Sequence, residues 1–160
     1  MEKQILDQIL DNTKYDTRIA PEGILANGSS GPVVVSTNMY LRKIEYICTA
    51  RQQWKPQITF RHQWKDPRVV FDDKKGQIKY LTLEQYDRIW KPDTFISNSL
   101  LTESHTDLKQ NILIRIYPNG DVLLSTRLTV TASCPMDLLH YPFDSQKCLL
   151  QFASCELLSK

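Results

Sequence analysis

Two cysteines, Cys134 and Cys148, enclose thirteen residues that read Pro-Met-Asp-Leu-Leu-His-Tyr-Pro-Phe-Asp-Ser-Gln-Lys. A disulfide between them would close a short loop and join the strand expected to end at Ser133 to one expected to begin near Leu149. Closing a loop of this size removes on the order of 3 kcal/mol of unfolded-state entropy. The methionine, leucine, tyrosine and phenylalanine inside so small a loop cannot all be buried within it. They should therefore face the body of the domain or a partner.

The run Tyr141-Pro142-Phe143-Asp144 lies inside this loop and sets a proline between two aromatic residues. The cis peptide is least costly before proline, so we expect one between Tyr141 and Pro142. The cysteine spacing alone fits a plain stabilising disulfide as well as a functional loop. The Tyr-Pro-Phe-Asp run favours the functional loop, and a zinc site lacks companion ligands at the required spacing.

The start of the chain has a narrow apolar stripe, formed by Ile5, Leu6, Ile9 and Leu10. This stripe predicts a short amphipathic helix over residues 2–12 that must pack on something larger. Residues 20–32 contain two prolines and three glycines. They are predicted to form a loop.

From residue 33 onward the apolar period is two, which predicts strands. Residues 33–47 should form one long strand. Residues 54–64 should form another, whose core-facing side chains include Ile58, Phe60 and Trp64. Pro56 indicates an edge or a bulge near the start of this second strand.

Residues 111–117 and 121–133 form the clearest predicted hairpin, because Pro118-Asn119-Gly120 supplies the positive-φ residues of its turn. Many short antiparallel strands and one disulfide favour a β-sandwich. With 160 residues, the chain has the size of a single domain, which we place at residues 1–160.

Composition and motifs exclude several classes of function. A net charge of +2 is too small and too dispersed to indicate nucleic-acid binding. His62, His105 and His140 are far apart in sequence, and no catalytic or phosphate-binding motif is present, so we expect neither an enzyme nor a metal or cofactor site. No signal peptide is visible, and the longest aliphatic run, Val33–Val35, is far below the roughly 20 residues of a membrane helix. Either the chain is soluble or its targeting and membrane parts were removed.

Further motifs stand in a fixed order along the chain: Gly31-Pro32-Val33-Val34-Val35, Trp64-Lys65-Asp66-Pro67-Arg68, Ile89-Trp90-Lys91-Pro92-Asp93-Thr94-Phe95, Leu113-Ile114-Arg115-Ile116 and Pro118-Asn119-Gly120. With the cysteine-bounded loop, they resemble the pentameric ligand-gated ion channels, or Cys-loop receptors, over nearly the whole chain. Cys134-Pro135-Met136 is similar to the anion-conducting branch. Residues 2–10 with Lys14-Tyr15-Asp16 are most similar to invertebrate glutamate-gated chloride channels.

The resemblance implies an all-β fold: an immunoglobulin-like β-sandwich with a short N-terminal α-helix, C-terminally truncated before the last strands and all transmembrane helices. It implies the extracellular ligand-binding part of a glutamate-gated chloride channel subunit, located on the extracellular side of the postsynaptic membrane. The implied partners are a small-molecule neurotransmitter, L-glutamate, the other subunits of a homo- or hetero-pentamer, and the membrane through the missing region. The fragment alone would be soluble or secreted.

Three residues of the predicted strands, Arg42, Arg61 and Ser125, would converge on one outward-facing patch if their strands are sheet neighbours. Guanidinium groups bind carboxylates bidentately, so the patch would suit a small dicarboxylate. Arginines on exposed strand faces are usually just solvated, and the pattern alone favours that interpretation. The resemblance reverses this preference, because it assigns the three residues to the complementary side of the glutamate site.

The resemblance also assigns two residues to the principal side of the site, Phe95 and Ser154. From the residues alone, Phe95 fits a core aromatic equally well. Cys155 stands where the family usually has an aromatic that contacts the ligand's ammonium group. The third segment of this side lies beyond residue 160, so the principal side is expected to be incomplete.

In the family the two cysteines Cys134 and Cys148 are disulfide-bonded, and the loop tip presses on the membrane domain. The tip residues here are Tyr141, Pro142, Phe143 and Asp144. Asn27 begins a glycosylation sequon in a stretch rich in glycine and serine.

Some alternatives stay open. Cys48 and Cys155 have no place in the family pattern and could pair with each other, remain free or bridge chains. The chain could also be a truncated or secreted channel-less binding protein or isoform that captures ligand or modulates assembly. A plain immunoglobulin-like adhesion module is a third possibility, and it predicts no convergence of Arg42, Arg61 and Ser125.

Overall fold

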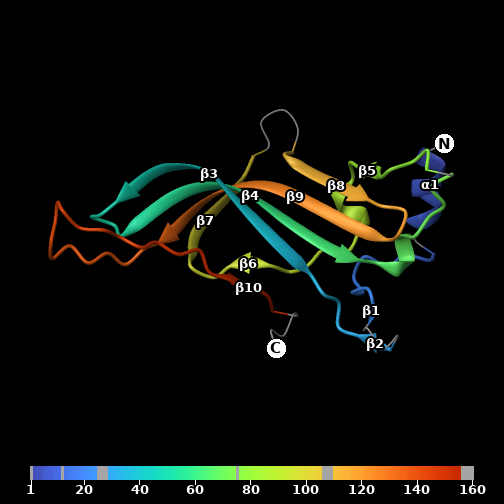
Figure 1. Ribbon diagram of the computed structural model, residues 1–160, viewed down its shortest axis with the longest axis horizontal. Helices are drawn as coiled ribbons and strands as arrows, with labels where there is room; N and C mark the ends of the chain where they lie inside the picture. Colours follow the sequence, from blue (N-terminus) through green and yellow to red (C-terminus); the bar gives the residue numbers. More distant parts are fainter. Residues whose placement is uncertain (1, 12, 25–28, 75, 106–109, 156–160) are drawn as a thin grey trace. The chain divides into compact units, whose positions relative to one another are not determined.

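The computed structural model describes residues 2–11, 13–24, 29–74, 76–105 and 110–155. The chain forms two compact units. Unit 1 comprises residues 1–38, 61–92 and 112–126, and unit 2 comprises residues 39–60, 93–111 and 127–160. The three longest strands each contribute residues to both units: β3 (Ser36–Cys48), β4 (Gln53–Lys65) and β9 (Asp121–Ser133) (Figure 1).

The fold is a β-sandwich with one short helix, as the sequence predicts. The main sheet has the strand order β3-β4-β9-β8-β5, with β7 also paired to β9. Its shorter strands are β5 (Leu81–Leu83), β7 (Ser99–Ser104) and β8 (Ile112–Ile116). Two small antiparallel pairs complete the strands, β1 (Gly23–Ile24) with β2 (Ser30–Gly31) and β6 (Phe95–Ile96) with β10 (Phe152–Ala153).

The predicted N-terminal helix is α1, Glu2–Ile9. It is shorter than the predicted residues 2–12, and Asn12 lies outside the described residues. Ile5, Leu6 and Ile9 pack against the core of unit 1, and Leu10 is buried in it. An eight-residue helix is too short to be stable alone, so this packing holds it in place.

The core of unit 1 is built from the inward faces of β4, β5, β8 and β9. It includes Trp64, Leu81, Leu83, Ile114, Ile116, Val122 and Leu124. Two single-turn 3₁₀ helices, Pro67–Val69 and Tyr86–Arg88, lie in the connections of this unit. The side chains of Trp64 and Trp90 meet edge to face, with ring centroids 5.8 Å apart.

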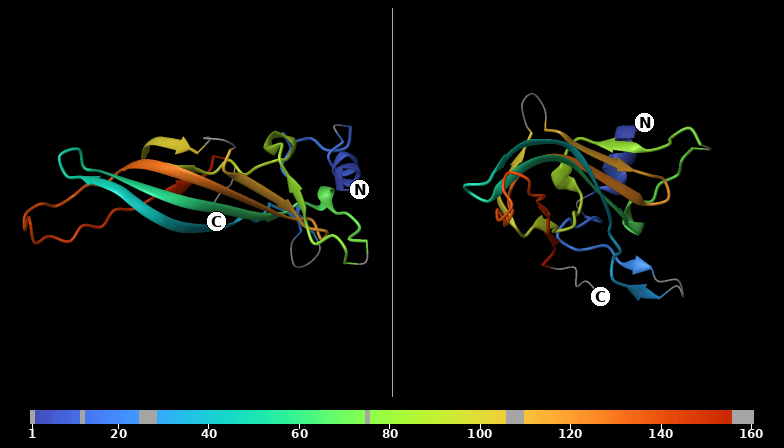
Figure 2. Two further views of the ribbon diagram at one scale, coloured as in Figure 1. Left: turned by 90° about the horizontal axis from the view of Figure 1, so that it is seen from above. Right: turned by 60° about the vertical axis from the view of Figure 1, so that its left-hand side comes forward.

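The β8–β9 hairpin is confirmed, and its two strands lie side by side in every view (Figures 1 and 2). Among the described residues of its turn only Gly120 has a positive φ, +84°, so Asn119 does not supply one as predicted. The space around Gly120 also demands glycine. A Cβ there would lie 2.8 Å from the Asp66 carbonyl oxygen and 2.9 Å from Cγ2 of Val70.

The core of unit 2 lies between the main sheet and the β6–β10 pair. Trp54, Ile58 and Phe60 of β4 meet Ile96, Val130, Ala132, Cys134 and Met136 there. Phe60 and Phe152 stack with ring centroids 4.6 Å apart and planes 17° apart. The predicted alternation of β4 is therefore confirmed, because Ile58, Phe60 and Trp64 are all buried.

Three expectations about the strands are corrected. Residues 20–32, predicted as a loop, contain the β1–β2 pair. In this pair Gly23 lies so near Pro32 that a Cβ on residue 23 would be 2.0 Å from the Pro32 carbonyl oxygen, so the position requires glycine. The long strand β3 begins at Ser36 rather than Val33. β4 lies between β3 and β9, so Pro56 does not mark an edge strand; a bulge there stays a prediction.

Candidate ligand-binding site and disulfide loop

Arg61 borders a pocket of about 320 Å³ in unit 1. The lining comes from β3, β4 and β9: Ser36, Thr37, Asn38, Arg61, His62, Gln63 and Leu123. The Arg61 side chain is exposed at this pocket. A guanidinium can bind a carboxylate through charge-assisted hydrogen bonds, which are stronger than neutral ones.

Ser125 does not line this pocket, but it lies two residues from Leu123 on the same strand, β9. Side chains two apart on a strand share a face. Ser125 is half-buried and stands opposite Leu113 in the β8–β9 ladder. Within unit 1, Arg61 and the face of β9 that bears Ser125 therefore border the same pocket.

In unit 2, Arg42 of β3 donates from Nη1 to Oγ1 of Thr59, at 3.3 Å. This bond places Arg42 on the face of β4 that carries Thr59. The same face carries Gln57, whose Oε1 accepts from Nη2 of Arg127 at 2.7 Å. The face of β4 predicted to be polar therefore carries Gln57 and Thr59 in unit 2 and Arg61 and Gln63 in unit 1. Gln57 itself is buried.

A ring of hydrogen bonds surrounds Gln57 in unit 2. Its Nε2 lies 3.2 Å from Nε2 of His105 and donates to Oγ1 of Thr129 at 3.4 Å, and His105 and Thr129 are 2.8 Å apart. Sequence reasoning missed this network, because its members come from two strands, β4 and β9, and from His105, which directly follows β7. The alternation that put Gln57 on the polar face was the only available signal.

Phe95 and Ser154 come together in unit 2 through the β6–β10 pair, in which Phe95 stands opposite Ala153. Ser154 Oγ donates to Oδ1 of Asp93, and the Cys155 N–H donates to Oδ2 of the same carboxylate at 2.7 Å. Phe95 is 46% exposed, so it is not a core aromatic. An exposed aromatic beside this ordered turn has a free face for a ligand or a partner.

Cys134 and Cys148 are disulfide-bonded, with Cα atoms 5.0 Å apart, and the Tyr141–Pro142 peptide is cis as predicted. Met136 is buried in the core of unit 2, whereas Leu139, Tyr141 and Phe143 are 80%, 68% and 92% exposed. The sequence predicted that these apolar side chains face either the body of the domain or a partner. Their exposure shows that the side chains of the loop tip do not pack on the body of the domain. His140 of the same loop is also exposed.

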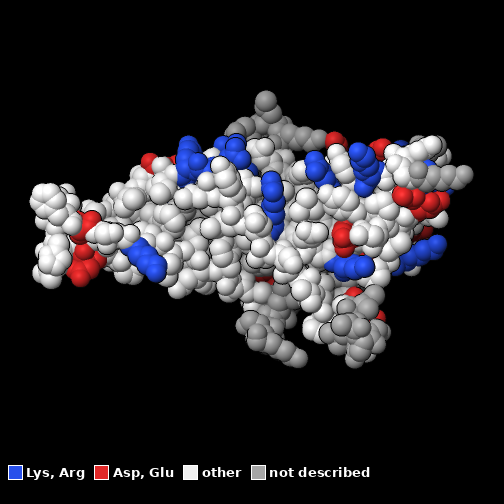
Figure 3. Space-filling view, in the orientation of Figure 1, with Lys and Arg blue, Asp and Glu red and all other residues white. Residues whose placement is uncertain are grey.

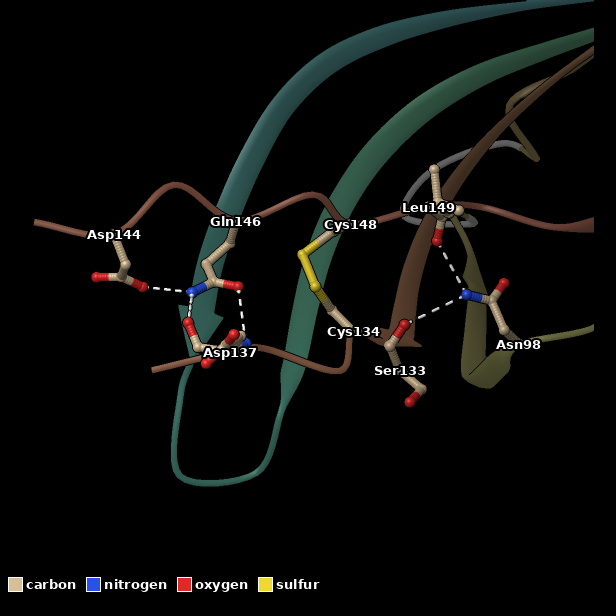
Figure 4. The surroundings of a disulfide bond; sticks show 8 residues. All are labelled: Asn98, Ser133, Cys134, Asp137, Asp144, Gln146, Cys148 and Leu149. Atoms are coloured by element: carbon tan, nitrogen blue, oxygen red, sulfur yellow. Dashed lines mark hydrogen bonds between the residues drawn. A yellow bond between two sulfur atoms is a disulfide. The ribbon is translucent and has the colours of Figure 1, made fainter. Parts of the chain in front are cut away.

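Two amides hold the disulfide loop (Figure 4). Asn98 donates from Nδ2 to the carbonyls of Ser133, at 3.3 Å, and Leu149, at 2.9 Å, and so joins the chain on both sides of the disulfide. Its Oδ1 accepts from the Gln151 N–H at 3.0 Å. Inside the loop, Gln146 bonds with other loop residues. No sequence signal identified either amide, since both act across distant positions.

The remaining predicted positions are the glycosylation site, the two other cysteines, and any metal site or membrane helix. Asn27 lies outside the described residues, so its glycosylation stays a prediction. Cys48 and Cys155 are free thiols. Within the described part of the chain, no cluster of three or more His, Cys, Asp or Glu side chains could hold a metal ion. None of the described helices has the length and apolar character needed to cross a membrane.

Charged side chains are interspersed on the face drawn in Figure 3, where Lys and Arg appear in several separate places. This distribution agrees with the small net charge of +2. On this face the described charges are of both signs, unlike the single-sign stripe that binds nucleic acid.

The chain combines a β-sandwich, a disulfide loop that follows the long strand β9, and a polar face on β4. Residues 2–158 match the neurotransmitter-gated ion-channel ligand binding domain, and the chain belongs to this family. It is 48% identical over 153 residues to a glutamate-gated chloride channel of Drosophila melanogaster. The match covers 96% of this chain and 33% of the relative, so the chain spans about a third of that channel's length.

Proposed function

We propose that this chain is the extracellular ligand-binding part of a glutamate-gated chloride channel subunit. The single observation that supports this best is the pocket in unit 1 that Arg61 borders together with polar side chains of β3 and β4. A guanidinium in a polar pocket is suited to a carboxylate ligand. The identity of 48% with a channel named for glutamate supports the choice of ligand.

Arg61, Ser125 and Arg42 are the proposed ligand-binding residues of the complementary side. Arg61 binds one carboxylate of the agonist, and the Ser125 hydroxyl adds a neutral donor. Arg42 is already directed by its bond to Thr59 onto the polar face of unit 2. Each guanidinium is suited to a carboxylate, and this is the proposed basis of selectivity for an acidic agonist.

Phe95 and Ser154 are the proposed residues of the principal side, which a neighbouring subunit would present to the complementary side in a homo- or hetero-pentamer. The exposed ring of Phe95 and the bond between Ser154 and Asp93 support this assignment. Closure at that contact would favour one of two channel states, as in other ligand-driven population shifts.

The loop tip Tyr141, Pro142, Phe143 and Asp144 is proposed to contact the membrane part of the channel and to bias its gate. Its support is the exposure of Tyr141 and Phe143, because such apolar side chains gain free energy when a partner covers them. This assignment places the chain on the extracellular side of the postsynaptic membrane, with Asn27 as a glycosylation site.

The test is a chimera in which residues 2–154 replace the matching segment of the Drosophila channel. Glutamate should evoke chloride currents in cells that express it. Arg61→Ala should raise the half-maximal glutamate concentration at least 30-fold, since loss of one partner of a buried charge pair costs about 2–5 kcal/mol.

Lys79→Ala is the matched control, because Lys79 is an exposed cation of unit 1 outside the pocket. It should leave the glutamate response within about twofold of the parent. An unchanged response in Arg61→Ala, with normal surface expression, would remove Arg61 from the site. A chimera that ignores glutamate but opens with another transmitter would overturn the proposed ligand.

A further inference from the structure

Gln146 uses every hydrogen-bonding group of its side-chain amide inside the disulfide loop (Figure 4). Its Oε1 accepts from the Asp137 N–H at 3.1 Å. One Nε2 hydrogen goes to the Asp137 carbonyl oxygen, at 2.5 Å, and the other goes to Oδ2 of Asp144. One side chain thus pairs both polar backbone groups of Asp137, as a neighbouring strand would.

These bonds close the loop a second time, inside the disulfide. The disulfide encloses residues 135–147, whereas the Gln146 bridge to Asp137 and Asp144 leaves only residues 138–143 between its anchor points. A shorter closed loop has fewer conformations. The bridge therefore restricts the segment that contains Tyr141 and Phe143.

Packing of apolar side chains does not restrict this segment. Leu139, Tyr141 and Phe143 are mostly exposed, and the buried Met136 lies before the bridge. The hydrogen bonds described for residues 138–143 are local ones, such as the Tyr141 N–H to the Leu138 carbonyl at 3.1 Å. Among the described contacts, the Gln146 bridge is what connects the two ends of the tip.

We infer that Gln146 is a positioning residue for gating: it holds the loop tip in the conformation that its partner in the membrane part recognises. This inference rests on the proposed function for its consequence, but the bridge itself can be tested without a channel. Without the bridge, agonist would still bind, and the tip would transmit binding less effectively because fewer molecules hold it in the competent shape.

The decisive variant is Gln146→Glu, which keeps the size and the acceptor but replaces the donating nitrogen with an oxygen. That oxygen would face the Asp137 carbonyl and the Asp144 carboxylate, and both contacts become repulsive. Gln151→Glu is the matched control. It makes the same chemical change at an exposed position outside the disulfide loop.

The first measurement is amide hydrogen exchange on the 160-residue chain. In Gln146→Glu the two repulsive contacts should move the side chain away from Asp137, so the Asp137 N–H loses its acceptor as well. Its amide should then exchange about tenfold faster than in the parent or in Gln151→Glu, which corresponds to a hydrogen bond of about 1.4 kcal/mol. Equal exchange in all three chains would overturn the bridge. Gln146→Met, which is similar in size and uncharged, should also speed exchange and separates loss of the bonds from added charge.

The second measurement uses the channel chimera described above. Gln146→Glu should lower the maximal glutamate current per surface-expressed channel at least fivefold, while glutamate displaces a bound competitor with unchanged affinity. A purely structural role would lower surface expression and leave the current per channel unchanged, and that result overturns the gating inference. Combining Gln146→Glu with Asp144→Asn should restore part of the current, because the asparagine amide can donate to the new carboxylate.

The two proposals fail differently. A parent chimera that never responds to glutamate contradicts the proposed function, and the exchange measurement then still decides whether the bridge exists. A responsive parent with a fully active Gln146→Glu variant contradicts the inference about Gln146 alone.

Discussion

Arg68 binds both oxygens of the Asp66 carboxylate, with Nε 2.9 Å from Oδ1 and Nη2 2.8 Å from Oδ2. Asp66 is fully buried, and it also accepts from the hydroxyl of Tyr15 at 2.9 Å. The Arg68 guanidinium lies over the Tyr15 ring, 4.4 Å from its centroid. Through these contacts with Tyr15, the Asp66–Arg68 ion pair joins the segment after α1 to the end of β4 within unit 1. Burial raises the pKa of the Tyr15 hydroxyl well above its usual value.

Asp66→Asn should therefore destabilise the chain strongly. Breaking a buried pair leaves the arginine without its counter-charge and typically costs about 3–5 kcal/mol. The free energy of unfolding in guanidinium chloride would measure the loss. Asp72→Asn is the control. Asp72 is exposed, its ion pair with Lys74 is long at 3.7 Å, and its Oδ1 accepts from the Lys74 N–H at 3.0 Å, a bond that asparagine can keep, so stability should change by less than about 0.5 kcal/mol. Equal losses in the two variants would contradict the structural role of Asp66.

Gly120 and Gly76 separate backbone strain from steric overlap. Both have positive φ, +84° and +81°, but a Cβ at Gly76 would meet nothing within 4 Å, whereas one at Gly120 would overlap Asp66 and Val70. Gly76→Ala should cost about 1 kcal/mol for its conformation alone. Gly120→Ala should cost a further 1–3 kcal/mol of overpacking. Thermal unfolding of both variants gives the comparison, and similar midpoints would exclude the close approach at Gly120.

His62 should make stability depend on pH. Burial lowers the pKa of its imidazole to about 4, from 6.5 in the unfolded chain. Between these values the unfolded state binds the proton more readily, so the free energy of unfolding is highest above pH 6.5 and falls as the pH drops toward 4. From pH 7 to pH 5 the loss from His62 should be about 1–2 kcal/mol.

Denaturant titrations at pH 7 and pH 5 check this expectation. His62→Gln should lose that part of the pH dependence, because glutamine has no proton to bind in this range. His140→Gln changes an exposed histidine and should behave like the parent. If His62→Gln and the parent lose the same stability on acidification, the burial of a neutral His62 is wrong.

Asn98 should matter for the disulfide region more than its single side chain suggests. Asn98→Leu keeps a similar volume but deprives the Ser133 and Leu149 carbonyls and the Gln151 N–H of a partner. Unsatisfied groups cost about 1–3 kcal/mol when buried, and we expect a total in that range because the site is half-buried. Asn111→Leu, at an exposed position, is the control. Unfolding midpoints that agree between the two variants would show that the Asn98 bonds contribute little.

Local patterns predicted the parts of this fold that depend on neighbours in sequence. The alternation of β4 follows from side-chain period, and the β8–β9 hairpin from its turn residues. The cis peptide bond between Tyr141 and Pro142 was predicted from the local preference of proline. The family motifs, read in order, also placed the chain in the family to which it belongs.

The strand pairings and the polar contacts of the candidate site could not be read in the same way. The β1–β2 pair lies inside a glycine-rich stretch and depends on a close approach between Gly23 and Pro32. The period of apolar residues does not predict this approach. Phe95 could be a core or a surface aromatic by pattern, and only the packing of β6 on β10 left it exposed. For the same reason, the network around Gln57 was invisible until β4 and β9 were neighbours.

The sequence by itself determined the class of fold, the family and the position of the disulfide loop, because alternation, turn chemistry and motif order are properties of short stretches. The tertiary structure decided how that loop is held and what its tip presents. Gln146, Asn98 and their partners are separated along the chain by up to 53 residues and meet only after the strands have paired. A hydrogen bond needs both atoms within about 3 Å, and a sequence does not state which distant atoms come that close.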